Sequence, residues 1–115
     1  METYEVVLDA LADPTRRRIL NGLRGRPRSV ADIAHELPVS RPAVSQHLKV
    51  LRGGGLVTFE TVGTRNLYRA DPAGMHVLRA WMDEFWDTAL QSYAEFAEQQ
   101  QGQQPEQPPY SDKDG

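Results

Sequence analysis

Residues 39–51, VSRPAVSQHLKVL, constrain this chain more than any other stretch, because they combine a helix start with two chemically different faces. Ser40 occupies the position of a helix N-cap, since its hydroxyl can accept a hydrogen bond from a free N–H of the first turn. Val44, Leu48 and Leu51 recur at the spacing of one helical face, which predicts that this face packs on a core. The opposite face and its flanks are polar or cationic, and they consist of Arg41, Pro42, Ser45, Gln46, Lys49 and Arg52.

This outer face carries no carboxylate, although a solvated helix face usually mixes both signs of charge. The side chains of Ser, Gln, Arg and Lys can hydrogen-bond to phosphates and to base edges. The face therefore favours an anionic partner such as DNA. An ordinary amphipathic surface helix is the alternative that this stretch alone leaves open.

A second short helix is expected immediately before this one. Ser29 with Asp32 three residues later forms a variant of the capping box, whose usual last member is Glu or Gln. Pro38 ends that helix just before Ser40 begins the next. Two short helices joined by a tight turn, the second with an acid-free face, indicate a helix-turn-helix.

The second helix of the helix-turn-helix, formed by residues 39–51, is the expected recognition helix. The stretch that follows it predicts a wing. Gly53 is the first of three glycines and is expected to be a left-handed C-cap. The β-prone runs 56–59 and 66–69 flank residues 63–64, which have the Gly-X form of a two-residue hairpin turn. A hairpin beside a helix-turn-helix is a wing, and Arg65 at its tip is expected to reach a phosphate or the minor groove. An ordinary exposed turn arginine is the alternative.

The two ends of the chain predict a dimer contact. Residues 4–11 form a short amphipathic helix, and residues 73–100 form a long one whose apolar arc of roughly 180° exceeds the ~100° needed to cover one core. We expect the long helix to pack both on its own domain and on a second subunit. The residues expected at the dimer contact are Tyr4, Val7, Leu8, Leu11, Trp81, Phe85, Trp86, Ala89 and Tyr93.

Charge is segregated along the chain. The net charge is −3 overall, but residues 1–12 carry −3, residues 13–79 carry +7 and residues 80–115 carry −7. A basic middle between acidic ends attracts DNA locally and limits how the protein docks. In the helix expected from Pro14, Arg16, Arg17 and Arg18 fall on successive faces, and at least one of them is expected to contact a phosphate, with Arg16 and Arg17 as the candidates. Solvation or a surface ion pair is the alternative.

The expected fold class is mostly α with a small β-hairpin wing: a winged helix-turn-helix with a long C-terminal dimerisation helix. Residues 1–101 are expected to form this domain, and residues 102–115 a disordered polar tail. The absence of Cys excludes disulfides and thiolate metal sites. No apolar run approaches membrane-spanning length, and the first ten residues are acidic rather than basic, which predicts a cytoplasmic protein without a membrane partner.

Three segments of the sequence resemble the ArsR/SmtB family of bacterial winged-helix repressors: LADPTRRRIL, SVADIAHELPVSRPAVSQHLKVLRGGGLV and GTRNLYRADP. The resemblance covers roughly residues 4–93. It implies a homodimer built from the first and last helices, repression by operator occupancy, and DNA contacts at Ser40, Arg41, Ser45, Gln46, His47 and Arg65. His47 lies nearer the core edge of its helix, so a base contact and a bridge between core and phosphate both stay open.

The chain departs from founding members of this family at the sites that sense metals. Those members use a cysteine pair or clusters of His, Asp and Glu, whereas this chain has no Cys, and His35, His47 and His76 stand at unrelated spacings. The sequence thus resembles the cysteine-free branch, and no metal site or cofactor is expected. A site that joins His76 to Asp83 or Asp87 across a dimer is the alternative.

Three other functions are alternatives to the repressor. A metal-responsive repressor with His and carboxylate ligands is one, and a winged-helix module for protein contacts is another. An enzyme is the third, but the sequence has no Ser-His-Asp arrangement, nucleotide loop or paired carboxylates in a plausible pocket, so no enzymatic activity is expected.

Overall fold

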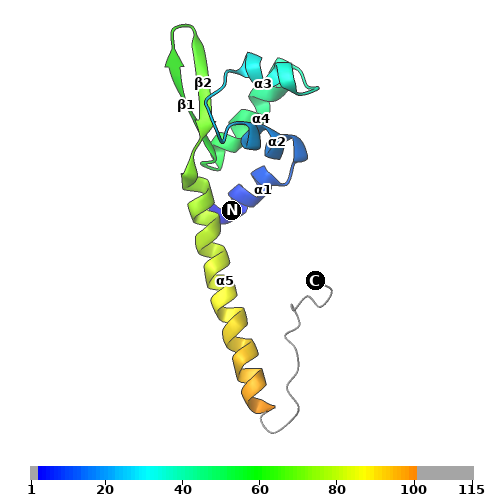
Figure 1. Cartoon of the computed structure of the whole chain (residues 1–115), viewed down its shortest axis with the longest axis vertical. Coiled ribbons are helices and arrows are strands. Elements are labelled where there is room, and N and C mark those ends of the chain that lie inside the picture. The colour runs from blue at the N-terminus through cyan, green and yellow to red at the C-terminus, as the bar shows by residue number, and fades with distance from the viewer. Residues whose placement is uncertain (1–2, 101–115) are drawn as a thin grey trace. The chain divides into compact units, whose positions relative to one another are not determined.

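A computed structural model describes residues 3–100 of the 115. The elements in chain order are α1 (Thr3–Leu11), α2 (Pro14–Gly22), α3 (Val30–Glu36), α4 (Arg41–Gly53), β1 (Val57–Val62), β2 (Arg65–Ala70) and α5 (Pro72–Gln99) (Figure 1). The chain divides between Asp83 and Glu84 into two compact units. The expected tail, residues 102–115, lies outside the described residues. Within residues 3–100, no helix combines the length and apolar content needed to cross a membrane.

Asp13 caps the start of α2. Its backbone is extended, and its Oδ1 accepts hydrogen bonds from the N–H groups of Thr15 (2.7 Å) and Arg16 (3.3 Å). Burial pushes the pKa of Asp13 upward, but these N–H donors and the charge of Arg16 outweigh it, so the pKa lies below its usual value. The ionised carboxylate is therefore the form that the cap stabilises.

Both helices of the helix-turn-helix begin at the expected residues. The Ser29 hydroxyl accepts a hydrogen bond from the N–H of Asp32 (3.1 Å), and the Asp32 carboxylate accepts one from the N–H of Ser29 (3.3 Å). The expected capping box is thus confirmed, with Asp in place of Glu. Ser40 caps α4 by accepting from the N–H of Ala43 (3.2 Å). These caps determine where the two helices start, and hence the length of the turn between them.

Helix α4 lies at the centre of the unit formed by residues 3–83, where it contacts α1, α2, α3 and β1. Its side chains Val44, Leu48 and Leu51 are at most 1% exposed, which confirms the predicted apolar stripe. The recognition helix is therefore held by three other helices and by the base of the hairpin. The buried hydrophobic core consists of Val7, Ala10, Ile19, Leu20, Leu23, Ile33, Val44, Leu48, Leu51, Leu56 and Val57.

The end of α4 differs from the expectation at its glycines. The helix continues through Gly53, and the left-handed residue is Gly55 (φ +71°), two positions later. The N–H of Gly55 donates to the carbonyl of Arg52 (2.9 Å), and the N–H of Leu56 donates to that of Leu51 (3.0 Å). These two bonds form a Schellman motif, which satisfies the last carbonyls of the helix and turns the chain into β1.

Strands β1 and β2 form the expected antiparallel hairpin, from the Val57–Ala70 pair at its base to the Val62–Arg65 pair at its tip. Gly63 has a φ of +66°, as the first position of a type II′ turn requires, so the predicted two-residue turn is confirmed. The base of the hairpin is buried in the core and its outer part is exposed.

Candidate nucleic-acid interface

The outer face of α4 is accessible and free of acids. Val50, which follows Lys49 on α4, is 38% exposed and adds apolar surface that the sequence did not predict. A β-hairpin follows this helix directly, so a helix and a wing are available to one ligand (Figure 1). The exposed residues predicted to contact DNA on this face are Ser40, Arg41, Pro42, Ser45, Gln46 and Lys49.

His47 lies between this face and the core, as its helical position predicts. Its ring is half buried, and its Nδ1 lies 3.5 Å from Nη1 of Arg16 on α2. A contact with α2 occupies one edge of the imidazole. A role in joining α4 to α2 is therefore supported by the geometry, whereas a contact with DNA stays a prediction.

Arg16 and Arg17 make hydrogen bonds within the protein that the sequence did not predict. Arg16 donates from Nε to the carbonyl of Ala10 (2.7 Å) and from Nη2 to that of Asp9 (3.1 Å). Arg17 donates from Nη1 to the carbonyls of Leu11 (2.8 Å) and Ala12 (3.2 Å). The last carbonyls of a helix lack partners within it, and the two guanidinium groups satisfy those of α1. This geometry supports a structural role for both arginines, and their contact with phosphates stays a prediction.

We expect Arg16→Ala to lower the free energy of unfolding by about 1–2 kcal/mol, because it removes charge-assisted hydrogen bonds in a half-buried place. Urea denaturation of the purified protein measures this value. Arg18→Ala is the control: Arg18 is exposed on the same helix, and its replacement is expected to change stability by less than about 0.5 kcal/mol. If Arg16→Ala leaves stability unchanged and weakens the salt dependence of DNA binding, Arg16 instead contacts a phosphate.

Two arginines lie on or beside the wing. Arg65 is the first residue of β2, next to the turn, and it is exposed. Arg52, in the last turn of α4, places its guanidinium carbon 4.6 Å from the ring centroid of Phe59 on β1. This cation–π contact joins the recognition helix to the wing and still leaves Arg52 exposed.

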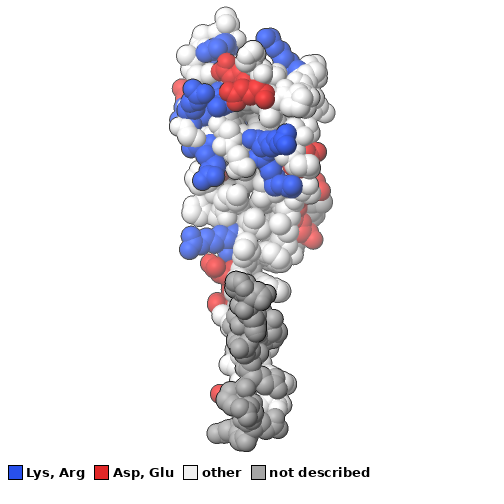
Figure 2. Space-filling view, turned by 45° about the vertical axis from the view of Figure 1, so that its right-hand side comes forward, with Lys and Arg blue, Asp and Glu red and all other residues white. Residues whose placement is uncertain are grey.

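The basic residues of the central segment are displayed on the surface. Figure 2 shows Lys and Arg side chains spread over the visible face of the winged-helix part, with acidic side chains among them and along its right-hand edge. On the wing, Arg69 pairs with Glu60 (2.9 Å) and Thr61 donates to Asn66 (2.7 Å), so part of this polar surface serves the hairpin itself.

Helix α1 carries the first group of expected dimer residues. Tyr4 stacks on Trp81 of α5 with ring centroids 4.9 Å apart, and both are half buried in the same chain. Leu8 is 40% exposed, and Leu11 packs partly against the core. Val7 corrects the expectation: it is fully buried in its own domain, because its face of α1 packs on the core. Val7 is therefore not a dimer contact.

The second half of α5, residues 84–99, carries the other expected dimer residues. Phe85 is 59% exposed and Trp86 is 44% exposed, and their rings meet edge to face with centroids 6.4 Å apart. Leu90 and Phe96 add exposed apolar surface, at 45% and 49%. Ala89 lies in this half too. Large apolar side chains left exposed together in this way mark a contact surface.

No three side chains of His, Cys, Asp or Glu within residues 3–100 lie together in a group that could hold a metal ion. His35, His47 and His76 lie on three different helices, α3, α4 and α5. A site that joins His76 to Asp83 or Asp87 of a second subunit requires two chains and stays an alternative prediction.

A helix-turn-helix whose second helix presents an acid-free face beside a β-hairpin defines the class of winged helix-turn-helix transcriptional regulators. Comparison with known proteins gives the same class. Residues 13–58 match the bacterial regulatory proteins of the arsR family. The HTH-type transcriptional regulator Rv2034 of Mycobacterium tuberculosis is 50% identical over 98 residues, covering 83% of this chain and 92% of that protein.

Two solved structures are similar over most of the chain. An ArsR-like transcriptional regulator from Rhodococcus sp. RHA1 is 34% identical with a TM-score of 0.71, covering 83% of this chain and 92% of that one. The homodimeric winged helix-turn-helix DNA-binding domain of Mb0332 from Mycobacterium bovis is 29% identical with a TM-score of 0.59, covering 90% and 88%. This chain belongs to the ArsR family of bacterial transcriptional regulators.

Proposed function

We propose that the chain acts as a homodimeric repressor that occupies an inverted-repeat operator and thereby blocks a promoter. The observation that carries the proposal is the exposed face of α4, which presents Arg41, Ser45, Gln46 and Lys49 without a carboxylate, next to the wing. The name of the Mycobacterium bovis neighbour, a homodimeric DNA-binding domain, supports the same assembly. Occupancy alone accounts for repression, so the proposed role is that of a cytoplasmic regulator and not of an enzyme.

The side chains divide into two roles by their chemistry. Ser45 and Gln46 can donate to and accept from base edges, so we assign them to reading sequence. Arg41, Lys49 and Arg65 carry full positive charges, so we assign them to phosphates, which fix register and orientation. Arg52 contributes charge beside them while it rests on the wing.

The dimer determines how far apart the two recognition helices lie. Two copies of α4 can enter successive major grooves when they are about 34 Å apart, one turn of B-DNA. We assign the dimer contact to the accessible apolar residues of α1 and α5. A change in the packing of these helices would misalign both copies of α4 with their grooves at once. The geometry of the dimer is therefore the quantity that a regulatory signal would act on.

Fluorescence anisotropy tests the proposal directly. The full chain is titrated on DNA from its own promoter and on scrambled DNA of the same length, over a series of salt concentrations. We expect preferential binding of promoter DNA with two protomers per site and a steep fall of log affinity with log salt. Equal binding to both DNAs, or none at low salt, would contradict an operator at this promoter.

Gln46→Ala and Lys49→Ala are expected to distinguish a base contact from a phosphate contact. Gln46→Ala should weaken operator binding by about 1–3 kcal/mol and relax the preference at one base pair, because a base contact is lost. Lys49→Ala should weaken operator and scrambled DNA alike and reduce the salt slope by about 1. Anisotropy on both DNAs measures these effects.

The two variants serve as controls for each other, since both shorten an exposed side chain on one face of α4. Equal losses on operator and scrambled DNA in both variants would show that this division of roles is wrong.

A further inference from the structure

Arg28 lies between α2 and α3, and its backbone pairs with β2. Its N–H donates to the carbonyl of Tyr68 (2.9 Å), and the N–H of Tyr68 donates back to the carbonyl of Arg28 (2.8 Å). This reciprocal pair places a third extended segment beside the hairpin. The support matters because an isolated two-stranded hairpin is at best marginally stable in water.

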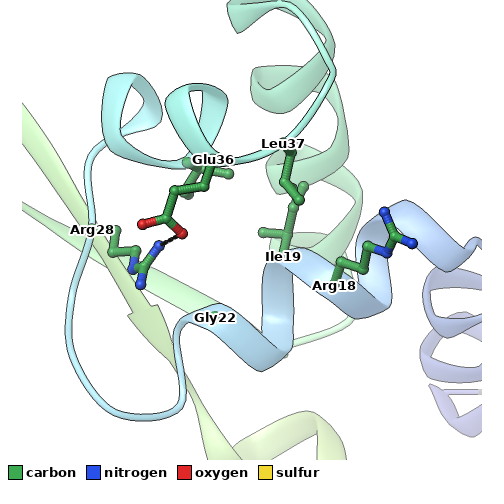
Figure 3. Close-up of a pocket in the computed structure, with 7 residues that line it drawn as sticks. Arg18, Ile19, Gly22, Arg28, Glu36 and Leu37 are labelled. Carbon is green, nitrogen blue, oxygen red and sulfur yellow. Dashed lines mark hydrogen bonds and ion pairs between the residues drawn. The ribbon is translucent and has the colours of Figure 1, made fainter.

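The side chain of Arg28 joins the same segment to α3. Its Nη1 pairs with Oε1 of Glu36, the last residue of that helix (Figure 3). The Arg28 side chain is only 15% exposed, and its buried Nε has no hydrogen-bond partner among the described residues. Loss of Glu36 would leave a largely buried charge without its ion-pair partner, which is unfavourable.

The ion pair borders a small hollow between α2 and α3. Ile19, Ile33 and Leu37 line this hollow together with both partners of the ion pair. Arg18 lines the hollow too, but it points away from Glu36 (Figure 3). Arg28 is therefore the cation that Glu36 holds.

The wing also interacts electrostatically with the start of α3. The backbone N–H and hydroxyl of Ser29 lower the pKa of Asp32, and the positive charges of Arg65 and Arg28 lower it further. Arg65 thus lies close enough to α3 for its charge to act on that helix. Helix α3 in turn contacts both β2 and α4.

We propose that Arg28 and Glu36 are positioning residues, which fix the wing relative to the recognition helix by joining β2 to α3. The wing then offers Arg65 to DNA at the same time as α4 enters the groove. Neither Arg28 nor Glu36 needs to touch DNA for this. The inference rests on the proposed function, in which Arg65 holds a phosphate.

A double-mutant cycle between Glu36→Gln and Arg65→Ala tests the positioning role on the full chain. In the unaltered protein, Arg65→Ala should weaken operator binding about fivefold at 0.15 M salt, the effect of one phosphate contact. In the Glu36→Gln background the same replacement should have almost no effect, because the wing is no longer held in place. An unchanged fivefold loss in that background would overturn the proposal.

The sign of the single effect gives a second criterion. Glu36→Gln removes a negative charge, so a general electrostatic effect would tighten DNA binding. A positioning role predicts weaker binding instead. The matched control is Glu60→Gln, which removes a similarly exposed carboxylate from an ion pair internal to the hairpin. Tighter binding by both variants would overturn the proposal.

Amide hydrogen exchange of the free protein separates this inference from the proposed function. Glu36→Gln should speed the exchange of the Arg28 and Tyr68 amides several-fold, while the amides of Val44 and Leu48 in α4 keep their rates. Unchanged rates at Arg28 and Tyr68 would overturn the positioning role, whatever the protein binds. Faster exchange in a protein without operator preference would instead contradict the proposed function alone.

Discussion

Replacement of Gly74 by alanine is expected to lower the free energy of unfolding by about 2–3 kcal/mol, because there is no room for a side chain at this position. A Cβ on Gly74 would overlap the carbonyl oxygen of Gly54 and lie 3.0 Å from the carbonyl carbon and oxygen of Gly55. Backbone atoms cannot rotate away as a flexible side chain would. The N–H of Gly74 also donates to the carbonyl of Gly55 (2.8 Å), so the clash would disturb this hydrogen bond as well. Urea denaturation measures the loss.

Gly53→Ala is the matched control for Gly74→Ala. Gly53 is the last residue of α4, and a Cβ there would meet nothing within 4 Å. Because alanine restricts the unfolded chain more than glycine does, this variant should be neutral or slightly more stable. Equal losses in both variants would show that the close approach of α5 to the end of α4 contributes nothing specific.

The backbone contact of Gly74 with Gly54 and Gly55 also bears on how a change in the dimer could affect DNA binding. The backbone of Gly74, in the first turn of α5, lies against the carbonyl groups of Gly54 and Gly55, which directly follow α4. A shift of the first turn of α5 would therefore act directly on the backbone at the end of α4. We expect Gly74→Ala to weaken operator binding even at temperatures where the variant is folded.

Local signals in the sequence predict the elements well. Ser29 and Ser40 cap their helices at the expected places, because each cap needs only a side-chain oxygen and an N–H group three residues later. The hairpin follows from Gly63 and its flanking β-prone residues in the same way. The stripe of α4 is predicted because the helical period alone brings its members to one face.

The errors of the sequence reasoning arise where distant segments meet. The hydrogen bonds of Arg16 and Arg17 could not be predicted, because only the fold places the last carbonyls of α1 beside these side chains. Val7 has the same spacing as the exposed residues of α1, and only the docking of that helix shows which of them face inward. Arg28 carries no local signal, because its partner Tyr68 lies forty residues later on the wing. The acid-free face needed no such docking, which is why it could be predicted.

Phe85→Glu is expected to weaken operator binding by at least about 100-fold. The variant should be monomeric, and a monomer binds one half-site, whereas the two linked protomers of a dimer bind both half-sites. Phe85 is 59% exposed in the single chain, so the replacement leaves the fold intact while it places a charge in the proposed dimer contact. Analytical ultracentrifugation with anisotropy measures assembly and affinity together. Gln91→Glu, which adds the same charge to the polar face of α5, should leave both unchanged. A monomeric Phe85→Glu protein with full operator affinity would show that the dimer is not the DNA-binding species.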